Sequence, residues 1–155
     1  MVAAIIAVTV IADQLTKQAA RSALLHGGPR EYLGGIVSLL YAENSGAFLS
    51  LGASLPPTVR SFIFSALVAA GLLAALWVVL TGRVESRLDT VALALIIGGG
   101  IGNLIDRLRF AGRVTDFLYF AVGPLHTGVF NVADMAITGG VIWLAISWFR
   151  PRRLS

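Results

Sequence analysis

Four long apolar stretches constrain this chain more than any other feature of its sequence. They cover roughly residues 2–20, 58–81, 88–108 and 129–149. In each stretch the apolar residues lie all around the helix rather than along one stripe, which is the pattern of a helix that spans a membrane. The sequence therefore predicts an all-α membrane protein in which four transmembrane helices form a single integral membrane domain, residues 1–155.

The composition supports lipid as the solvent for most of the chain and excludes several kinds of site. Charged residues make up 13% of the sequence, whereas a soluble domain carries about 25%. There is no cysteine, and the two histidines, His26 and His126, cannot by themselves build a metal site, so we expect no metal and no cofactor. The basic residues are scattered through loops and tails without a basic stripe, which argues against nucleic acid and favours contact with membrane lipid.

The connections between the stretches differ in kind. The first loop, 21–57, is long, and its segment 32–44 alternates enough to predict short strands at the membrane interface. The third loop, 109–128, has an aromatic half suited to the headgroup level. An up-and-down arrangement places these two loops on the same side. Counting Lys and Arg does not decide the orientation, but the clustered arginines of the tail favour cytoplasmic termini and extracytoplasmic long loops.

Polar residues form a stripe on three of the predicted helices, and each stripe lies towards the side of the long loops. The stripes contain Thr9, Asp13, Thr16 and Lys17 in the first helix, Gly99, Asn103, Asp106 and Arg107 in the third, and Asn131, Asp134 and Thr138 in the fourth. Within each stripe the spacing puts the residues on one helix face. The long loops add Asn44 and Asp116. Because ionisable residues in membrane spans by default mark function, the convergence predicts one polar site near one membrane surface.

Many of these residues also have a purely structural interpretation. The candidates are Asp13 with Lys17, Asp106 with Arg107, and the amides Asn103 and Asn131. The first pair is spaced for an ion pair within the helix, and the second can fix a carboxylate in the same way. The amides can cap or cross-link helices. The glycine-rich run 98–103 favours close helix packing over nucleotide binding, because no strand precedes it.

Asp116 and Asp134 fit a structural interpretation least well. Asp116 has no basic residue nearer than Arg113, and Asp134 has none within ten positions on either side. Two carboxylates brought to one site of low dielectric constant cannot both ionise, so the pair shares a proton. A charged carboxylate next to a protonated one can activate water towards an amide. A cation from another helix could still pair with either residue.

A rival hypothesis also uses intramembrane carboxylates, namely a small proton- or cation-coupled transporter or channel component. That class favours internal repeats or broken helices that meet at the middle of the membrane. The sequence has no internal repeat, and its carboxylates lie near one face.

The sequence resembles the lipoprotein signal peptidase family, also called signal peptidase II. The matching motifs are Asp13-Gln-Leu-Thr-Lys17, Asn44-Ser-Gly-Ala-Phe48, Gly102-Asn-Leu-Ile-Asp-Arg107, Val114-Thr-Asp-Phe117 and Phe130-Asn-Val-Ala-Asp134. They occur in the family's order and span nearly the whole chain. The resemblance implies an aspartic endopeptidase of the bacterial inner membrane, which removes signal peptides from diacylglyceryl-modified prolipoproteins by cleaving before the lipidated cysteine.

The same resemblance implies roles for individual residues and a partner set. The catalytic pair falls on Asp116 and Asp134. The supporting polar residues fall on Asp13, Lys17, Asn44, Asn103, Asp106, Arg107 and Asn131, and Gly99 lies on the same helix face as three of them. The family also implies a small extracytoplasmic β-cradle and a short interfacial helix in loop 1, a site near the periplasmic face, and inhibition by the cyclic peptide globomycin. We expect a monomer.

Overall fold

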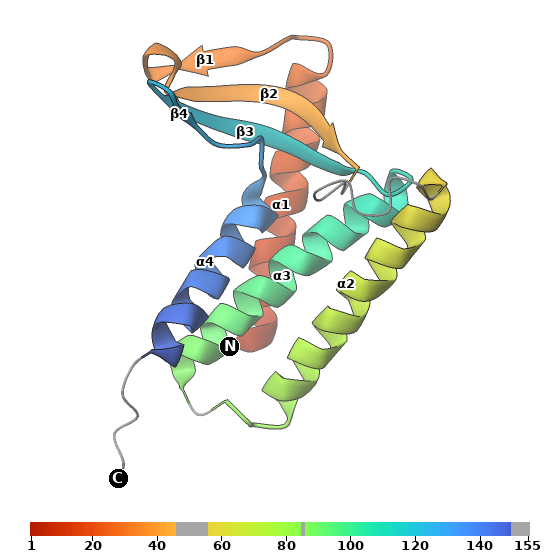
Figure 1. Cartoon of the computed structure of the whole chain (residues 1–155), viewed down its shortest axis with the longest axis vertical. Helices are drawn as coiled ribbons and strands as arrows, with labels where there is room; N and C mark the ends of the chain where they lie inside the picture. The colour runs from red at the N-terminus through yellow and green to blue at the C-terminus, as the bar shows by residue number, and fades with distance from the viewer. Residues whose placement is uncertain (46–55, 85, 150–155) are drawn as a thin grey trace.

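Four helices dominate the computed structural model, which describes residues 1–45, 56–84 and 86–149 (Figure 1). Their bounds are α1 Val2–Leu24, α2 Pro57–Leu80, α3 Arg87–Arg109 and α4 Val132–Trp148. Three of them, α1, α3 and the part of α2 from Ser61 to Leu80, are long and apolar enough to cross a membrane, and α4 is a shorter apolar helix of 17 residues. Helix α3 contacts each of the other three.

The outer faces of the helices are apolar, which is the reverse of a soluble bundle. Phe62, Leu67 and Leu73 of α2 are 74%, 63% and 67% exposed. Large apolar side chains exposed along whole helices would be unfavourable in water and are favourable in lipid. The polar side chains instead lie inside the bundle, so the chain is built as a membrane protein.

Glycines let the helices approach closely, as the run 98–103 predicts. A methyl group built on Gly98 would lie 2.8 Å from Cβ of Thr9 in α1. One built on Gly99 would lie 2.5 Å from the backbone oxygen of Ala133 in α4. Gly140 of α4 is equally close to the backbone of α3, at 2.6 Å from the oxygen of Ala92. Small residues at these crossings therefore bring the backbones of α1, α3 and α4 together.

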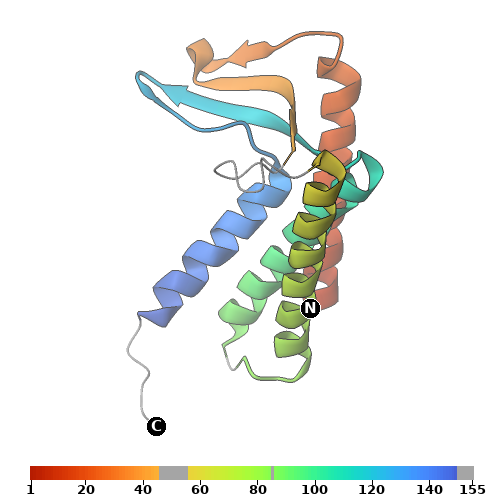
Figure 2. The same ribbon diagram turned by 45° about the vertical axis from the view of Figure 1, so that its right-hand side comes forward.

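A four-stranded antiparallel sheet lies across one end of the bundle, as Figures 1 and 2 both show. Its strands, in sheet order, are β1 Arg30–Tyr32, β2 Val37–Asn44, β3 Val114–Val122 and β4 Leu125–His126. Strand β2 pairs with β3 so that Ala42 lies opposite Asp116 and Asn44 opposite Val114. Loops 1 and 3 therefore lie on the same side, as the up-and-down arrangement predicts, and are joined by backbone hydrogen bonds.

Several boundaries differ from those predicted. The first helix continues to Leu24 rather than residue 20, because Ala20 and Leu24 form a small apolar core with Phe117 beneath the sheet. The third loop, expected to be an aromatic interfacial loop, instead contains strands β3 and β4. The last helix begins at Val132 rather than residue 129, because Phe130 still pairs with Leu118.

The short strands predicted at 32–44 are confirmed as β2 and the end of β1, which begins two residues earlier, at Arg30. A 3-10 turn, η1 Leu33–Gly35, connects them, and Gly34 there has a φ of 68°, which glycine adopts without a steric penalty. Residues 46–55, where the short helix of loop 1 is expected, lie outside the described residues.

Candidate active site

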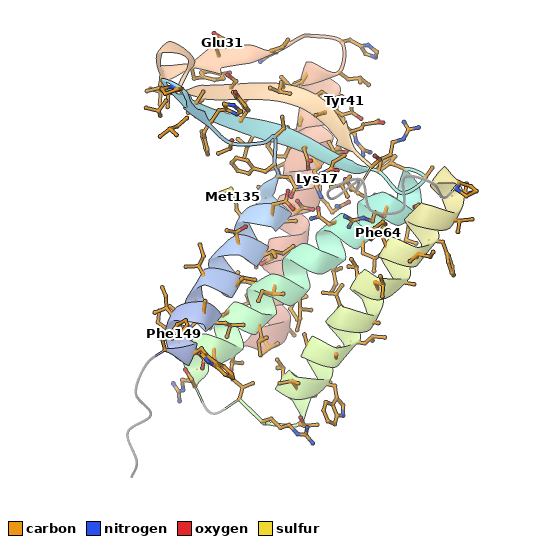
Figure 3. The ribbon with its side chains drawn as sticks, in the orientation of Figure 1. Lys17, Glu31, Tyr41, Phe64, Met135 and Phe149 are labelled. Atoms are coloured by element: carbon orange, nitrogen blue, oxygen red, sulfur yellow. The ribbon has the colours of Figure 1, made fainter. Side chains whose placement is uncertain are left out.

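A cluster of buried polar side chains lies beneath the sheet, where α1 and α3 approach β3 and α4 begins; Lys17 marks the position in Figure 3. All of its members are at most 6% exposed. They are Asp13, Lys17, Asn103, Asp106, Thr115, Asp116 and Asn131. Among the described residues, every buried side-chain nitrogen and oxygen has a hydrogen-bond partner. The three predicted stripes therefore converge at the end of the bundle that carries the long loops.

Ion pairs hold one half of the cluster together. Lys17 Nζ lies 2.8 Å from Asp13 Oδ2 and 3.6 Å from Asp106 Oδ2. Arg21 Nη2 lies 3.7 Å from Asp106 Oδ2. The predicted pair of Asp13 with Lys17 is confirmed, and Asp106 pairs with Lys17 and Arg21 of α1 rather than with its neighbour in sequence. Both of these carboxylates are thus neutralised by cations.

These two carboxylates also fix the start of the neighbouring elements. Asp13 Oδ1 accepts a hydrogen bond of 3.0 Å from the backbone nitrogen of Ala133, in the first turn of α4. Asp106 Oδ2 accepts one of 2.9 Å from the backbone nitrogen of Thr115, at the start of β3. The ion-paired half of the cluster therefore sets the positions of α4 and β3, which carry the other two aspartates.

Three residues of this network are missing from the sequence prediction. Gln14 Nε2 donates to Asp13, to Asp106 and to the backbone oxygen of Gly102. Arg21 donates to the hydroxyl of Thr115, which is fully buried. Gln14 directly follows Asp13, and Arg21 lies one turn after Lys17. A test of the long polar side chains within one turn of the Asp13–Lys17 pair would therefore have found both.

Amides hold the other half of the cluster, and Asn131 is central to it. Asn131 is the N-cap of α4 and forms a capping box with Asp134. Asn131 Oδ1 accepts a hydrogen bond of 2.9 Å from the backbone nitrogen of Asp134, and Asp134 Oδ2 accepts one of 3.3 Å from the backbone nitrogen of Asn131. Its Nδ2 donates to Asp116 Oδ1 at 2.6 Å. Asn103 Nδ2 donates to Asp134 Oδ1 at 2.8 Å, and Lys17 Nζ donates to the Oδ1 of that same asparagine. Asn131 thus binds both Asp116 and Asp134.

The electrostatics of the two halves differ. Among the described residues, neither Asp116 nor Asp134 forms an ion pair with a lysine or arginine. Arg107 interacts with both through longer-range electrostatics. Burial, followed by the negative charge of Asp134, raises the pKa of Asp116 to about 6, against the lowering effects of hydrogen bonds from Asn131 and Asn44. A carboxyl group with such a pKa can hold a proton near neutral pH.

The other predicted residues lie at the edge of this polar network or outside it. Asn44, at the exposed end of β2, hydrogen-bonds to Asp116. Gly99 contributes close packing against α4, one turn from Asn103. Within the described ranges the Thr16 hydroxyl bonds only to the backbone of its own helix, and Thr138 is exposed, so neither extends the cluster. His126 lies in the sheet with its ring 6.0 Å from that of Tyr119.

No group of three or more His, Asp or Glu side chains in the described ranges is placed to hold a metal ion. The amide-bound half of the cluster offers two hydrogen-bonded carboxylates, those of Asp116 and Asp134, together with several amide donors and the nearby guanidinium of Arg107. This arrangement can bind a polar group, take up a proton and release one.

Residues 5–150 match the model of one protein family, described as signal peptidase (SPase) II. The chain belongs to the signal peptidase II family. It is 36% identical to the lipoprotein signal peptidase of Hydrogenovibrio crunogenus over 94% of this chain and 84% of the relative. It is 41% identical to that of Geobacter sulfurreducens over 77% of this chain and 72% of the relative.

The fold matches as well. A bacterial membrane enzyme solved by the in meso method superposes with a TM-score of 0.81 at 26% identity, covering 96% of this chain and 92% of the other. The predicted resemblance to the signal peptidase II family is therefore confirmed, and nothing in these comparisons supports the rival transporter. Membership of a peptidase family agrees with a site that can donate and accept protons.

Proposed function

We propose that this protein is a membrane-embedded aspartic endopeptidase that removes the signal peptide from diacylglyceryl-modified prolipoproteins by cleaving before the lipidated cysteine. Asp116 and Asp134 are the catalytic pair. The observation that carries the proposal is that Asn131 binds both carboxylates while neither has an ion-pair partner among the described residues. The names of the relatives supply the substrate class.

In this reaction the two aspartates share one proton. The ionised carboxylate accepts a proton from a water molecule as the water oxygen attacks the carbonyl carbon of the scissile amide, and the protonated carboxyl donates to the carbonyl oxygen. The tetrahedral intermediate collapses when the carboxyl that took the proton from water passes it to the cysteine nitrogen, which leaves as an amine, while the other carboxylate accepts a hydroxyl proton of the intermediate as the carbonyl re-forms. Burial and the charge of Asp134 raise the pKa of Asp116 to about 6, which supports it as the member of the pair that takes up and releases a proton close to neutral pH.

The supporting residues divide into two groups in the proposed mechanism. Asn103 and Asn131 orient the carboxylates through hydrogen bonds of 2.6 to 3.3 Å. Asn44, which hydrogen-bonds to Asp116, and Arg107, which interacts electrostatically with both aspartates, stabilise the oxyanion that develops on the carbonyl oxygen. The ion-paired residues Asp13, Lys17 and Asp106, with Gly99 at the helix crossing, hold the elements in place.

In the proposed membrane arrangement, the whole chain, residues 1–155, is one integral domain with four crossings, of which α4 is the shortest. Both termini lie in the cytoplasm, and the sheet and the aspartates lie at the periplasmic face of the inner membrane. The two acyl chains of the substrate then lie in the bilayer, and their binding energy places the amide at the depth of the site. The protein acts as a monomer, without a cofactor, and globomycin inhibits it by binding over the pair.

The test is cleavage of a diacylglyceryl-prolipoprotein peptide by the purified protein and by Asp116→Asn and Asp134→Asn. Each substitution removes a titrating group and keeps the side-chain shape, so we expect the rate to fall by about 10²- to 10⁴-fold. Thermal unfolding in detergent should show that both variants are folded.

The matched control is Asp89→Asn. Asp89 is also a hydrogen-bonded carboxylate between helices, accepting from Trp143 Nε1 at 2.9 Å and Ser147 Oγ at 3.1 Å, but it lies at the opposite end of α3. Its variant should cleave at the normal rate, and globomycin should inhibit the wild type and the control alike. Normal turnover by either Asp116→Asn or Asp134→Asn would disprove the assignment.

A further inference from the structure

A cavity of about 520 Å³ opens between α1 and α3 near their loop ends. Its lining consists of the basic residues Lys17, Arg21 and Arg109, the glutamines Gln14 and Gln18, and Asp106 and Phe110. Asp116 and Asp134 are not part of the lining. The cavity shares a wall with the ion-paired half of the polar cluster and has no role in the proposed cleavage.

The lining carries one positive charge that the cluster does not neutralise. Lys17 and Arg21 are engaged with Asp13 and Asp106. Arg109 is exposed and has no ion pair with a carboxylate in the parts of the chain that the structure describes. The cavity therefore favours an anion.

The wall around Arg109 is held rigidly. The guanidinium of Arg21 stacks on the Phe110 ring, with Cζ 3.2 Å from the ring centroid, and its Nε donates to Thr115 at 2.8 Å. Arg21 and Phe110 are thus fixed before any ligand arrives, which lowers the ordering cost of binding. Gln18, one turn from Gln14, is exposed at the same opening and offers an amide donor.

Apolar side chains continue from the cavity towards the middle of the membrane. Ile11 and Leu15 of α1 are 56% and 61% exposed, and they share a helix face with Gln18. Leu108, next to Arg109, is 74% exposed. At 1.5 Å of rise per residue, Ile11 lies about 10 Å deeper than Gln18. A ligand that fits both the polar cavity and this apolar surface has a phosphate at the headgroup level and an acyl chain beneath it.

We propose that the cavity between α1 and α3 binds the headgroup phosphate of an anionic phospholipid through Arg109 and Gln18, with an acyl chain along Ile11 and Leu15. The polar part of this site would accept either a lipid headgroup phosphate or free inorganic phosphate. The apolar continuation favours the lipid as its source, and the unneutralised positive charge favours an anionic lipid over a zwitterionic one.

Native mass spectrometry of the whole purified chain in detergent tests this proposal without measuring cleavage, so its result is independent of the proposed peptidase activity. We expect one tightly bound phosphatidylglycerol and weaker binding of phosphatidylcholine with the same acyl chains. Arg109→Gln should weaken phosphatidylglycerol binding by about fivefold or more, as the loss of one arginine near the headgroup predicts. Gln18→Leu should weaken it by a smaller factor.

Arg87→Gln is the matched control, because Arg87 is an exposed arginine at the other end of α3. It should bind phosphatidylglycerol as the wild type does. Equal weakening in Arg87→Gln and Arg109→Gln, equal affinity for the two lipids, or unchanged binding in Arg109→Gln would overturn the proposal. So would displacement of the lipid by inorganic phosphate at equal concentration, because the site would then recognise the phosphate without the acyl chain.

Discussion

Four aspartates lie in the buried polar cluster or directly beside it, but the two between α1 and α3 differ from the two at β3 and α4 in their partners. Asp13 and Asp106 face Lys17 and Arg21. Asp116 and Asp134 instead accept hydrogen bonds from the amides of Asn131 and Asn103. A cation fixes a carboxylate in its charged form, whereas an amide orients the carboxylate and leaves its proton exchangeable. The first pair is therefore suited to holding the structure and the second to reacting.

The strongest way to break this comparison is Lys17→Met. Lys17 is 2% exposed and lies between Asp13 and Asp106. Its removal leaves buried charge uncompensated, so we expect the free energy of unfolding to fall by about 3–5 kcal/mol. Denaturant titration in mixed micelles measures this quantity.

The double variant Lys17→Met/Asp13→Asn provides the control for that measurement. Because it removes both charges of the ion pair, it should lose less stability than the sum of the two single variants. Asp116→Asn, from the other pair, should cost far less than Lys17→Met. Equal losses for those two variants would show that the two pairs do not differ in structural role.

Gly102→Ala tests the ion-paired half in a second way. A methyl group on Gly102 would lie 2.5 Å from Asp13 Oδ2 and displace that carboxylate, so we expect a loss of about 1–3 kcal/mol in the free energy of unfolding. Gly139→Ala is the matched control, because a methyl group there meets nothing within 4 Å. Thermal unfolding should separate the two variants, and equal midpoints would contradict the packing described here.

Asn131→Ser tests the amide hydrogen bond to Asp116. Of the three substitutions it has the smallest expected effect, a loss of about 1–2 kcal/mol in the free energy of unfolding. Serine still caps α4 but cannot donate an amide hydrogen to Asp116. That hydrogen bond lowers the pKa of Asp116 from what burial alone would give. Without it the pKa rises above about 6, so the pair keeps its shared proton to higher pH.

The measurement is the pH profile of kcat/KM, whose alkaline limb should move to higher pH in Asn131→Ser. Because the proposed pair shares one proton, the limb is assigned to the pair and not to one carboxyl alone. Arg113→Gln is the control: Arg113 pairs with Glu43 on the surface, at 2.6 Å, and its loss should leave the limb in place. A limb that stays fixed or moves to lower pH in Asn131→Ser would contradict the assigned hydrogen bond.

The sequence predicts the convergence of the polar residues because helical spacing and up-and-down threading determine it. Asp13, Lys17, Asn103 and Asp106 lie on the faces that their positions imply. The prediction that Thr138 belongs to the polar site is wrong, because after the first turn of α4 the inward face of the helix consists of apolar residues and glycines. Arg21 was missed because α1 extends past the predicted end of the apolar stretch to support the sheet.

Strand β3 could not be predicted from alternation. Its first four residues, Val114 to Phe117, are all buried, because both faces of the strand are covered: the Thr115 side chain contacts Arg21 of α1, and that of Asp116, on the opposite face, contacts Asn131 at the start of α4. A strand buried on both faces shows no period of two. The partner strand β2 alternates more clearly and was predicted. Register between strands from separate loops depends on tertiary contacts that a single sequence does not display.

The capping box at the start of α4 also has a consequence for the order of synthesis. Asn131, which donates to Asp116, takes up its position as α4 begins to form, and Asp134 lies in that helix itself, which follows the other three described helices along the chain. A chain in which this helix has not yet formed has Asp116 without the amide of Asn131 and without Asp134 beside it. Under the proposed assignment of Asp116 and Asp134, the reactive centre is therefore complete only once α4 has packed against the rest of the bundle.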